Sequence, residues 1–127
     1  MKTDMVIPVE ACIDGTLHEV SLEWDQRAAV CVVMASGGYP GKYGKGKEIF
    51  GITETENMQD VLLFHAGVKL DGGRYITSGG RVMGVTALGD GIGRAVDQAY
   101  SAVRTLKFED AYFRSDIAHR ALERESV

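Results

Sequence analysis

The 127-residue sequence is poor in proline and cysteine, with two of each, whereas glycine is abundant at 16 residues. Few prolines beside many glycines favour tight turns between strands over a disordered linker. Cys12 and Cys31 lie far apart, and each belongs to an apolar run. That placement is typical of buried free thiols in a reducing compartment, so the sequence predicts a cytoplasmic protein without a disulfide framework.

Long apolar runs and clustered positive charge are also missing. No apolar stretch approaches ~18 residues, and the N-terminus lacks the features of a signal peptide, so neither a membrane span nor secretion is expected. The net charge is −4, from 14 basic and 18 acidic residues that do not separate into stripes. A nucleic-acid surface needs a clustered positive face, so nucleic acid is not an expected partner.

The sequence shows no metal-ligand pattern and no catalytic set. His18, His65 and His119 are far apart and lack acidic neighbours at ligand spacing, which favours structural roles. No nucleophile with a nearby base stands out. We therefore predict no metal site and no catalytic residue within this chain.

Two glycine patterns resemble phosphate-binding motifs only in part. Gly41-x4-Gly46-Lys47 follows an apolar run, but Glu48 replaces the expected Ser or Thr and no helix pattern follows, which favours a flexible loop. The glycines at 89, 91 and 93 lie between a strand pattern and a helix pattern. Their spacing departs from the dinucleotide fingerprint, which favours a loose first helical turn.

Periodicity predicts helices at both ends of the chain. Residues 1–13 have apolar residues at helical spacing, and Gly15 lies where the helix should stop. Asp90 is a candidate N-cap for the longest helix, which has one apolar stripe. That stripe consists of Ile92, Ala95, Val96, Ala99, Val103 and Leu106. Shorter helices are expected at 53–60 and 116–124.

Strand patterns occupy the middle of the chain. Residues 28–35 form an uninterrupted apolar run, which predicts a strand buried on both faces. Further strands are expected at 20–24, 61–65 and 82–88. Residues 71–73, Asp-Gly-Gly, have the composition of a hairpin turn between two further strands, 69–70 and 74–77. A chain of this length has room for one domain, residues 1–127.

Three basic residues are candidates for an anion site. If strands 61–65 and 82–88 pair, Lys69 and Arg81 could converge beside Gly79 and Gly80, with Lys42 in the long loop as a third cation. Such cations with glycine amides would suit a phosphate or a carboxylate. The alternative is a solvated basic rim, and the residues alone favour it.

Several sequence blocks resemble one enzyme family. The blocks, in chain order, are EWDQRA (23–28), ASGGYPG (35–41), HAGVK (65–69), GGRVMGVTALGD (79–90) and DIAHRAL (116–122). Together they resemble the C-terminal part of phosphoribosylamine–glycine ligases, which are ATP-grasp enzymes of purine biosynthesis. The resemblance covers nearly the whole chain.

The resemblance implies an α+β fold, a small and mostly antiparallel sheet or partial barrel packed by helices. It implies an enzyme that joins phosphoribosylamine to glycine with ATP and Mg²⁺, giving glycinamide ribonucleotide. The ATP-grasp domain would lie upstream, with residues 1–15 as a linking helix. Since no counterpart of its acidic metal-binding motif is present, we expect this chain alone to be inactive and to bind neither ATP nor Mg²⁺.

The resemblance also implies site residues. Related domains hold a substrate phosphate with a hairpin lysine and an arginine before a Gly-Val strand, positions that match Lys69 and Arg81, with Gly80 alongside. The loop expected to face the same cleft comprises Ser36, Gly37, Gly38, Tyr39 and Pro40. Ser115 and Ala118 depart from the family pattern, which usually has a basic residue and glycine there.

Three functions remain open at this point. The chain could be the substrate-side domain of the ligase. It could instead be a packing module that completes the larger enzyme without touching substrate, or an independent binder of a small ligand. A phosphate contact at Arg81 would separate the first from the second.

Overall fold

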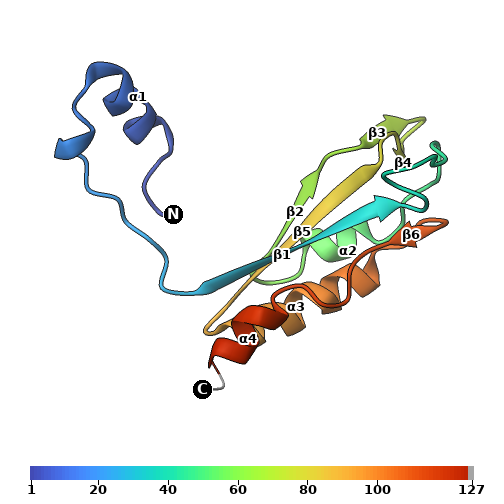
Figure 1. Cartoon of the computed structure of the whole chain (residues 1–127). Helices are drawn as coiled ribbons and strands as arrows, with labels where there is room; N and C mark the ends of the chain where they lie inside the picture. The colour runs from blue at the N-terminus through green and yellow to red at the C-terminus, as the bar shows by residue number, and fades with distance from the viewer. Residues whose placement is uncertain (126–127) are drawn as a thin grey trace.

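The computed structural model describes residues 1–125, which form an N-terminal arm and a body of helices and strands (Figure 1). The elements are α1 (Val6–Asp14), the 3-10 helix η1 (Leu17–Glu19), β1 (Ala28–Ser36), α2 (Ile52–Glu56), β2 (Val61–His65), β3 (Val68–Asp71), β4 (Arg74–Thr77), β5 (Arg81–Gly89), α3 (Ile92–Thr105), β6 (Ala111–Tyr112) and α4 (His119–Glu125). None of the helices in this range is long and apolar enough to cross a bilayer.

The body is built on a four-stranded antiparallel sheet in the order β2-β5-β1-β6. The nine-residue strands β1 and β5 form its centre, and β3 and β4 form a separate hairpin. Gly72 and Gly73 form the hairpin turn with positive φ of 55° and 80°, conformations that a Cβ disfavours. The predicted α+β class, the hairpin and the pairing of the strands at 61–65 and 82–88 are confirmed.

Helix α3 packs against one face of the sheet and forms the core with it (Figure 1). Its predicted apolar stripe is confirmed, since Ala95, Ala99 and Val103 are fully buried. The small alanines let the helix lie close to the fully buried Val32 and Val85 of the sheet. The core is therefore one layer of side chains between a helix and one sheet face.

Two predictions about burial are wrong, one for β1 and one for the cysteines. β1 is a strand as predicted, but it is not buried on both faces, because its residues alternate between the core and solvent. Cys31 is exposed, and so is Cys12 on α1, so the prediction of buried thiols is wrong. An unbroken apolar run cannot distinguish a strand covered on both faces from one that has a helix on one face only.

Residues 1–24, which we call the N-terminal arm, stand apart from the sheet in Figure 1. α1 ends at Gly15 as predicted, with φ of 72°. The backbone N–H of Lys2 donates to the Glu23 carbonyl at 2.7 Å, which closes the arm on itself. The strand predicted at 20–24 is wrong, because this segment has no partner strand to pair with.

The remaining helix predictions hold except for one cap. α2 and α4 lie within or close to the short helices expected at 53–60 and 116–124. Asp90 does not cap α3: the N-cap position is Gly91, and no side chain caps the helix there. Gly91 is extended, which puts Asp90 one residue too far from the first turn.

Candidate functional site

The loop after β1 is fixed against the segment that precedes β5. The Ser36 backbone N–H donates to the Gly80 carbonyl at 2.8 Å, and the Ser36 hydroxyl donates to the Gly79 carbonyl at 2.9 Å. Ser36 is only 5% exposed, so both bonds are protected from water. The structure thus brings together the loop at 36–40 and the Gly79-Gly80 turn. The two segments are more than 40 residues apart in the sequence.

Gly80 is required by the close approach of Tyr39. A Cβ at position 80 would overlap the Tyr39 ring. The Tyr39 ring in turn contacts Tyr43 edge-on, with centroids 5.9 Å apart. A larger residue at 80 would displace this ring, so glycine here sets the position of the loop.

A β-bulge in β5 decides where Arg81 points. Met34 pairs with Met83, but the next residue of β1, Ala35, pairs with Arg81, so Val82 is an extra residue in the ladder. Val82 and Met83 are both fully buried, whereas Arg81 is exposed. Without the extra residue Arg81 would share the core face with Met83, and its charge would be buried. The bulge therefore turns the arginine out of the core.

Arg81 and Tyr39 both line a cavity of about 540 Å³. Its lining residues are Val33, Tyr39, Phe64, His65, Ala66, Gly80, Arg81, Met83 and Gly84. Most of these contribute apolar surface, and Arg81 is the only lysine or arginine among them. A mostly apolar cavity whose lining includes one guanidinium suits a small ligand with a terminal anionic group.

Backbone hydrogen bonds connect the segment just before Lys69 to Arg81 and to Ser78. The Gly67 N–H donates to the Arg81 carbonyl at 2.9 Å, and the Ser78 N–H donates to the Gly67 carbonyl at 2.8 Å. Lys69 follows two residues later on β3 and is exposed, but it does not line the cavity. Neither Lys69 nor Arg81 forms an ion pair with any residue between 1 and 125.

His65 lines the cavity and also contacts two residues that are not part of the lining. It follows Phe64 at the end of β2, and its Nε2 lies 3.7 Å from a carboxylate oxygen of Glu56 on α2. Its ring also meets Tyr75 edge-on at 5.5 Å between centroids. These contacts fit the structural role expected for this histidine.

The two glycine patterns have structural explanations. The Lys47 ammonium forms an ion pair with Glu109 at 2.6 Å, and the Gly46 N–H donates to Thr77, so this loop is bound to its neighbours. At Gly89, a Cβ would lie 2.5 Å from the Ala95 backbone nitrogen. Glycine at 89 thus allows β5 and α3 to approach each other closely.

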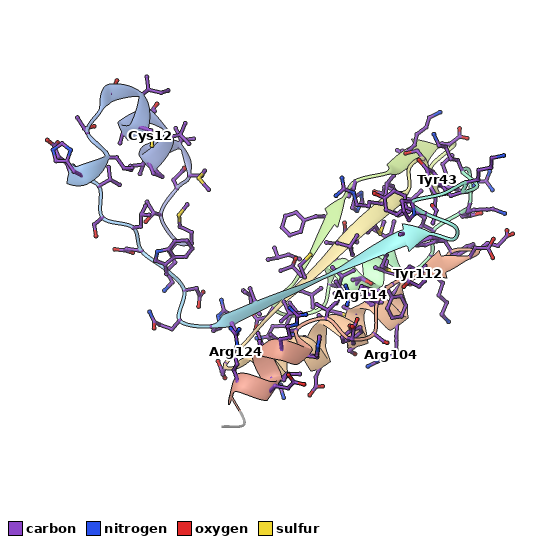
Figure 2. All side chains as sticks on the ribbon, in the orientation of Figure 1. Cys12, Tyr43, Arg104, Tyr112, Arg114 and Arg124 are labelled. Carbon is purple, nitrogen blue, oxygen red and sulfur yellow. The ribbon has the colours of Figure 1, made fainter. Side chains whose placement is uncertain are left out.

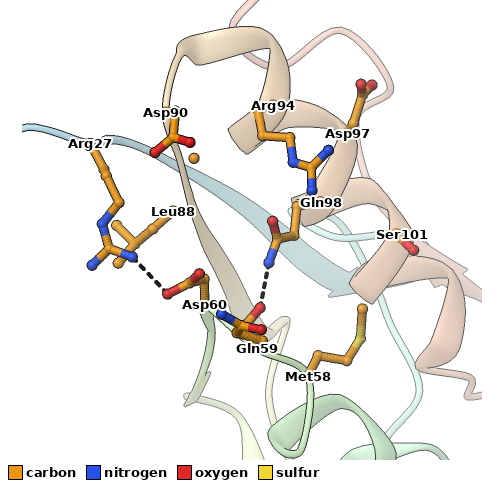
Figure 3. A pocket seen from close by; sticks show the side chains of 11 residues that line it. Arg27, Met58, Gln59, Asp60, Leu88, Asp90, Arg94, Asp97, Gln98 and Ser101 are labelled. Atoms are coloured by element: carbon orange, nitrogen blue, oxygen red, sulfur yellow. Dashed lines mark hydrogen bonds and ion pairs between the residues drawn. The ribbon is translucent and has the colours of Figure 1, made fainter.

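A second cavity, of about 520 Å³, lies at the opposite end of β5 (Figure 3). Arg27 donates to Asp60 at 2.7 Å and to both oxygens of Asp25, at 3.1 and 2.9 Å. The side-chain hydrogen bonds from Arg27 hold the pKa of Asp25 well below its usual range, and the same carboxylates raise the pKa of Arg27. Arg94 and Asp97 add one charge of each sign nearby.

This second cavity is less suited to an anion, because its best-placed cation is already neutralised by two carboxylates. The Gln98 side-chain amide also donates to the Gln59 carbonyl, which connects α3 to the segment before β2 (Figure 3). Sequence reasoning missed this cluster. The Asp25-x-Arg27 spacing could have indicated it, because the two side chains meet across a tight turn in which the Arg27 N–H also bonds to Asp25.

The residues do not fit a metal ion. Between residues 1 and 125, no three His, Cys, Asp or Glu side chains gather in a way that could hold one. A phosphoryl-transfer centre needs such a set to neutralise the transferring group. The cavity beside β5 is a candidate binding site because the guanidinium of Arg81 belongs to its lining.

The chain is an α+β domain with a small antiparallel sheet, one helix packed on the sheet, and a candidate binding cavity that includes Arg81. The sequence model of the family described as "Phosphoribosylglycinamide synthetase, C domain" matches residues 29–120, and the chain belongs to this family.

Individual relatives agree with this assignment. The chain is 49% identical over 123 residues to a phosphoribosylamine–glycine ligase of Rhodopirellula baltica, covering 96% of the chain and 28% of the relative. A ligase of the same name from Brucella melitensis is 42% identical over all 127 residues, which are 30% of its length. The arm is therefore shared with relatives.

A solved structure supports the fold. The crystal structure of phosphoribosylamine–glycine ligase from Thermotoga maritima matches with a TM-score of 0.67 and 33% sequence identity. The match covers 85% of the chain and 26% of that structure. The chain thus corresponds to the C-terminal domain of this ligase and spans little more than a quarter of the length of its relatives.

Proposed function

We propose that this chain is the substrate-side domain of a phosphoribosylamine–glycine ligase and that Arg81 binds the phosphate of phosphoribosylamine. The observation that carries the proposal is the orientation of Arg81. A bulge turns it out of the core, it lines a cavity, and it has no ion pair among residues 1–125. A planar, weakly hydrated guanidinium that has no ion pair and lines a cavity is well suited to a bidentate contact with phosphate.

Neighbouring backbone groups support the same role. The carbonyls of Gly79 and Gly80 accept bonds from Ser36, which orients this turn rigidly. The adjacent amide of Gly80 could then donate to a phosphate oxygen, as glycine-rich turns do in anion sites. The apolar floor formed by Val33 and Phe64 would contact the carbon skeleton of the sugar.

Lys69 is the second cation of this proposal. Its strand begins next to the Arg81 backbone, and its long side chain can extend over several ångströms. Because it does not line the cavity, we assign it an outer contact with the phosphate, weaker than that of Arg81. The loop at 36–40, through Tyr39, forms the opposite rim.

The full reaction requires the rest of the enzyme. We propose that residues 1–127 act as one domain, with residues 1–15 as a helix that links it to an upstream ATP-grasp portion. That portion would carry the sites for ATP and Mg²⁺, so the chain alone is expected to be inactive. The enzyme would form glycinamide ribonucleotide from phosphoribosylamine and glycine in the cytoplasm.

The test uses a joined protein, in which this chain replaces the matched C-terminal segment of the Rhodopirellula baltica ligase. The change Arg81→Ala is expected to raise the KM for phosphoribosylamine about tenfold or more, since a charged hydrogen bond contributes ~1.5–3 kcal/mol. The KM for ATP should stay the same. Steady-state kinetics with each substrate varied in turn provide the measurement.

Arg74→Ala is the matched control. Arg74 is also an exposed arginine, but it lies on the hairpin and pairs with Glu48 at 3.3 Å. Its loss should leave both Michaelis constants unchanged. If Arg81→Ala behaves like Arg74→Ala, the phosphate contact is wrong and the alternative below gains support.

The alternative is a packing module that completes the enzyme without touching substrate. The uncovered apolar side chains of the arm favour it, since Ile13 is 80% and Met5 62% exposed. Surfaces of this kind are typical of domain interfaces. Under this alternative, substitutions in the arm would affect the stability of the joined protein, whereas Arg81→Ala would leave its kinetics unchanged.

A further inference from the structure

The loop after β1 is held at both ends by the segment that follows α3, residues 107–112, which we call the clasp segment. At the start of the loop, the last two residues of β1 pair with β6. At its end, Phe50 and Lys107 exchange backbone hydrogen bonds of 2.9 and 3.1 Å. Figure 2 shows Tyr43 of the loop and Tyr112 of β6 at the same end of the body. The clasp segment thus connects the two ends of the loop.

The loop and the clasp segment meet where each makes a tight turn. In the loop, the Tyr39 N–H donates to the Ser36 carbonyl at 3.1 Å, and in the clasp segment the Ala111 N–H donates to the Phe108 carbonyl at 3.2 Å. Bonds between residues three apart are typical of β-turns. Ser36 is 5% and Phe108 8% exposed, so each turn begins at a buried residue.

Gly37 and Asp110 lie inside these two turns and contact each other. A Cβ at position 37 would lie 2.8 Å from both the Cβ and the carbonyl oxygen of Asp110. Carbon atoms in contact stay about 3.5–4.0 Å apart, so only glycine allows this approach. The φ of Gly37 is outside the left-handed region, so the contact with Asp110, and not the backbone conformation, requires glycine here.

An ion pair joins the same two segments at a second point. The Lys47 Nζ lies 2.6 Å from a carboxylate oxygen of Glu109, the residue before Asp110. The two side chains are 32% and 67% exposed, so the pair contributes little to the stability of the fold. It favours one position of the loop relative to the clasp segment.

We propose that the clasp segment positions Tyr39 at the Arg81 cavity. Tyr39 follows Gly37 by two residues, and its ring lies against Gly80 and lines the cavity. A shift of this turn away from the clasp segment would move the ring and change the shape of the cavity. The inference rests on the proposed function, because it takes phosphoribosylamine as the ligand of this cavity. Gly37 and Glu109 are then positioning residues, which act through Tyr39.

Gly37→Ala in the joined protein is the main test. The added methyl group pushes the turn at 36–39 away from Asp110, so we expect the KM for phosphoribosylamine to rise about fivefold or more. The KM for ATP should stay the same. Gly44→Ala is the matched control. Gly44 lies in the same loop, its φ is also outside the left-handed region, and a Cβ there would lie 3.7 Å from the Lys47 side chain. This control should leave both Michaelis constants unchanged.

Charge reversal tests the ion pair separately. Glu109→Lys is expected to raise the KM for phosphoribosylamine about two- to threefold, as suits an exposed pair. Adding Lys47→Glu should restore the native KM, because the pair can form again with its charges exchanged. Asp116→Lys is the control. It breaks the exposed 2.7 Å pair with Arg114, which lies outside the loop and the clasp segment, and should leave the KM unchanged.

Trypsin cleavage after Lys42 measures the loop without substrate. Lys42 is exposed within the loop, and cleavage requires the loop to open locally. In the joined protein, cleavage at this bond should be faster for Gly37→Ala than for Gly44→Ala. Mass spectrometry of the peptides gives the rate for this bond alone.

Equal cleavage rates for Gly37→Ala and Gly44→Ala would overturn the inference, because the contact with Asp110 would then not hold the loop. Faster cleavage with an unchanged KM in Gly37→Ala would also overturn it. A KM that Glu109→Lys leaves unchanged, or that the double charge reversal does not restore, would overturn the role of Glu109. Each of these results differs from an unchanged KM in Arg81→Ala, which is the failure of the proposed function.

Discussion

Arg27 and Arg81 lie at opposite ends of the central sheet and differ in what surrounds them. Arg27 donates three hydrogen bonds to two carboxylates, whereas Arg81 has no ion pair among residues 1–125. The first arginine holds the segment before β1 against the segment before β2. The second is turned out of the core by a bulge and remains available for a ligand. The same residue type thus serves the fold at one end and a candidate site at the other.

The two faces of β1 show a similar contrast between a side chain that packs in the core and one that does not. Val32 packs against α3 in the core, whereas its neighbour Val33 faces outwards and lines the Arg81 cavity. Their side chains are identical, so only the position relative to α3 separates them. The first two predictions below compare one member of such a pair with the other, and the third concerns the carboxylate beside Arg27.

The largest expected effect is a difference in the free energy of unfolding of the isolated chain between Val32→Ala and Val33→Ala. Removing two methyl groups from a fully buried valine should lower the free energy of unfolding by about 2 kcal/mol, through lost burial and the cavity left behind. The exposed Val33 should contribute less than about 0.5 kcal/mol. Urea denaturation followed by circular dichroism measures both free energies of unfolding. Equal losses of stability would mean that the sheet face that carries Val33 is packed within the chain.

A smaller difference, in the urea midpoint of the isolated chain, is expected between Arg27→Ala and Arg81→Ala. The loss of Arg27 leaves Asp25 and Asp60 without their cation, so the urea midpoint of the chain should fall. The loss of Arg81 should leave the midpoint unchanged, because no partner in the body loses a contact. A midpoint lowered equally by both changes would show that Arg81 also serves the fold.

The smallest effect concerns pH and the Asp25 carboxylate. Its pKa in the folded chain is depressed by hydrogen bonds from Arg27, below the ordinary value of 3.8. A depressed pKa stabilises the fold above the unfolded value, and this contribution is lost as the pH falls through the folded value. The difference in midpoint between the native chain and Asp25→Asn should therefore be constant above about pH 5 and shrink below pH 4. A pH-independent difference would contradict this assignment.

Local patterns were sufficient for several elements of the fold. The Asp71-Gly72-Gly73 turn predicted the hairpin, and the apolar stripe of residues 92–106 predicted α3, because turn chemistry and helical periodicity are properties of neighbouring residues. The predictions for 20–24 and for Asp90 were wrong. Whether an alternating segment becomes a strand depends on a partner strand, and a cap depends on the conformation of the following residue.

The candidate site was predictable as a set of residues but not as a geometry. The blocks around Ser36–Pro40 and Gly79–Arg81 carried the family resemblance, and the structure brings these two together. Lys69 was placed with them, and it lies beside the Arg81 backbone without lining the cavity. The sequence contained no signal for the bulge at Val82, because bulges are defined by pairing with a distant strand.

The sequence by itself determined the family, the hairpin, the long amphipathic helix and the identity of the candidate residues, since these depend on residue type and local spacing. Tertiary structure decided which face of the sheet α3 covers, which cysteines remain exposed, and which arginine is neutralised. Each of those outcomes depends on contacts between segments far apart in the chain. Arg81 faces the cavity because one residue of β5 has no counterpart in β1.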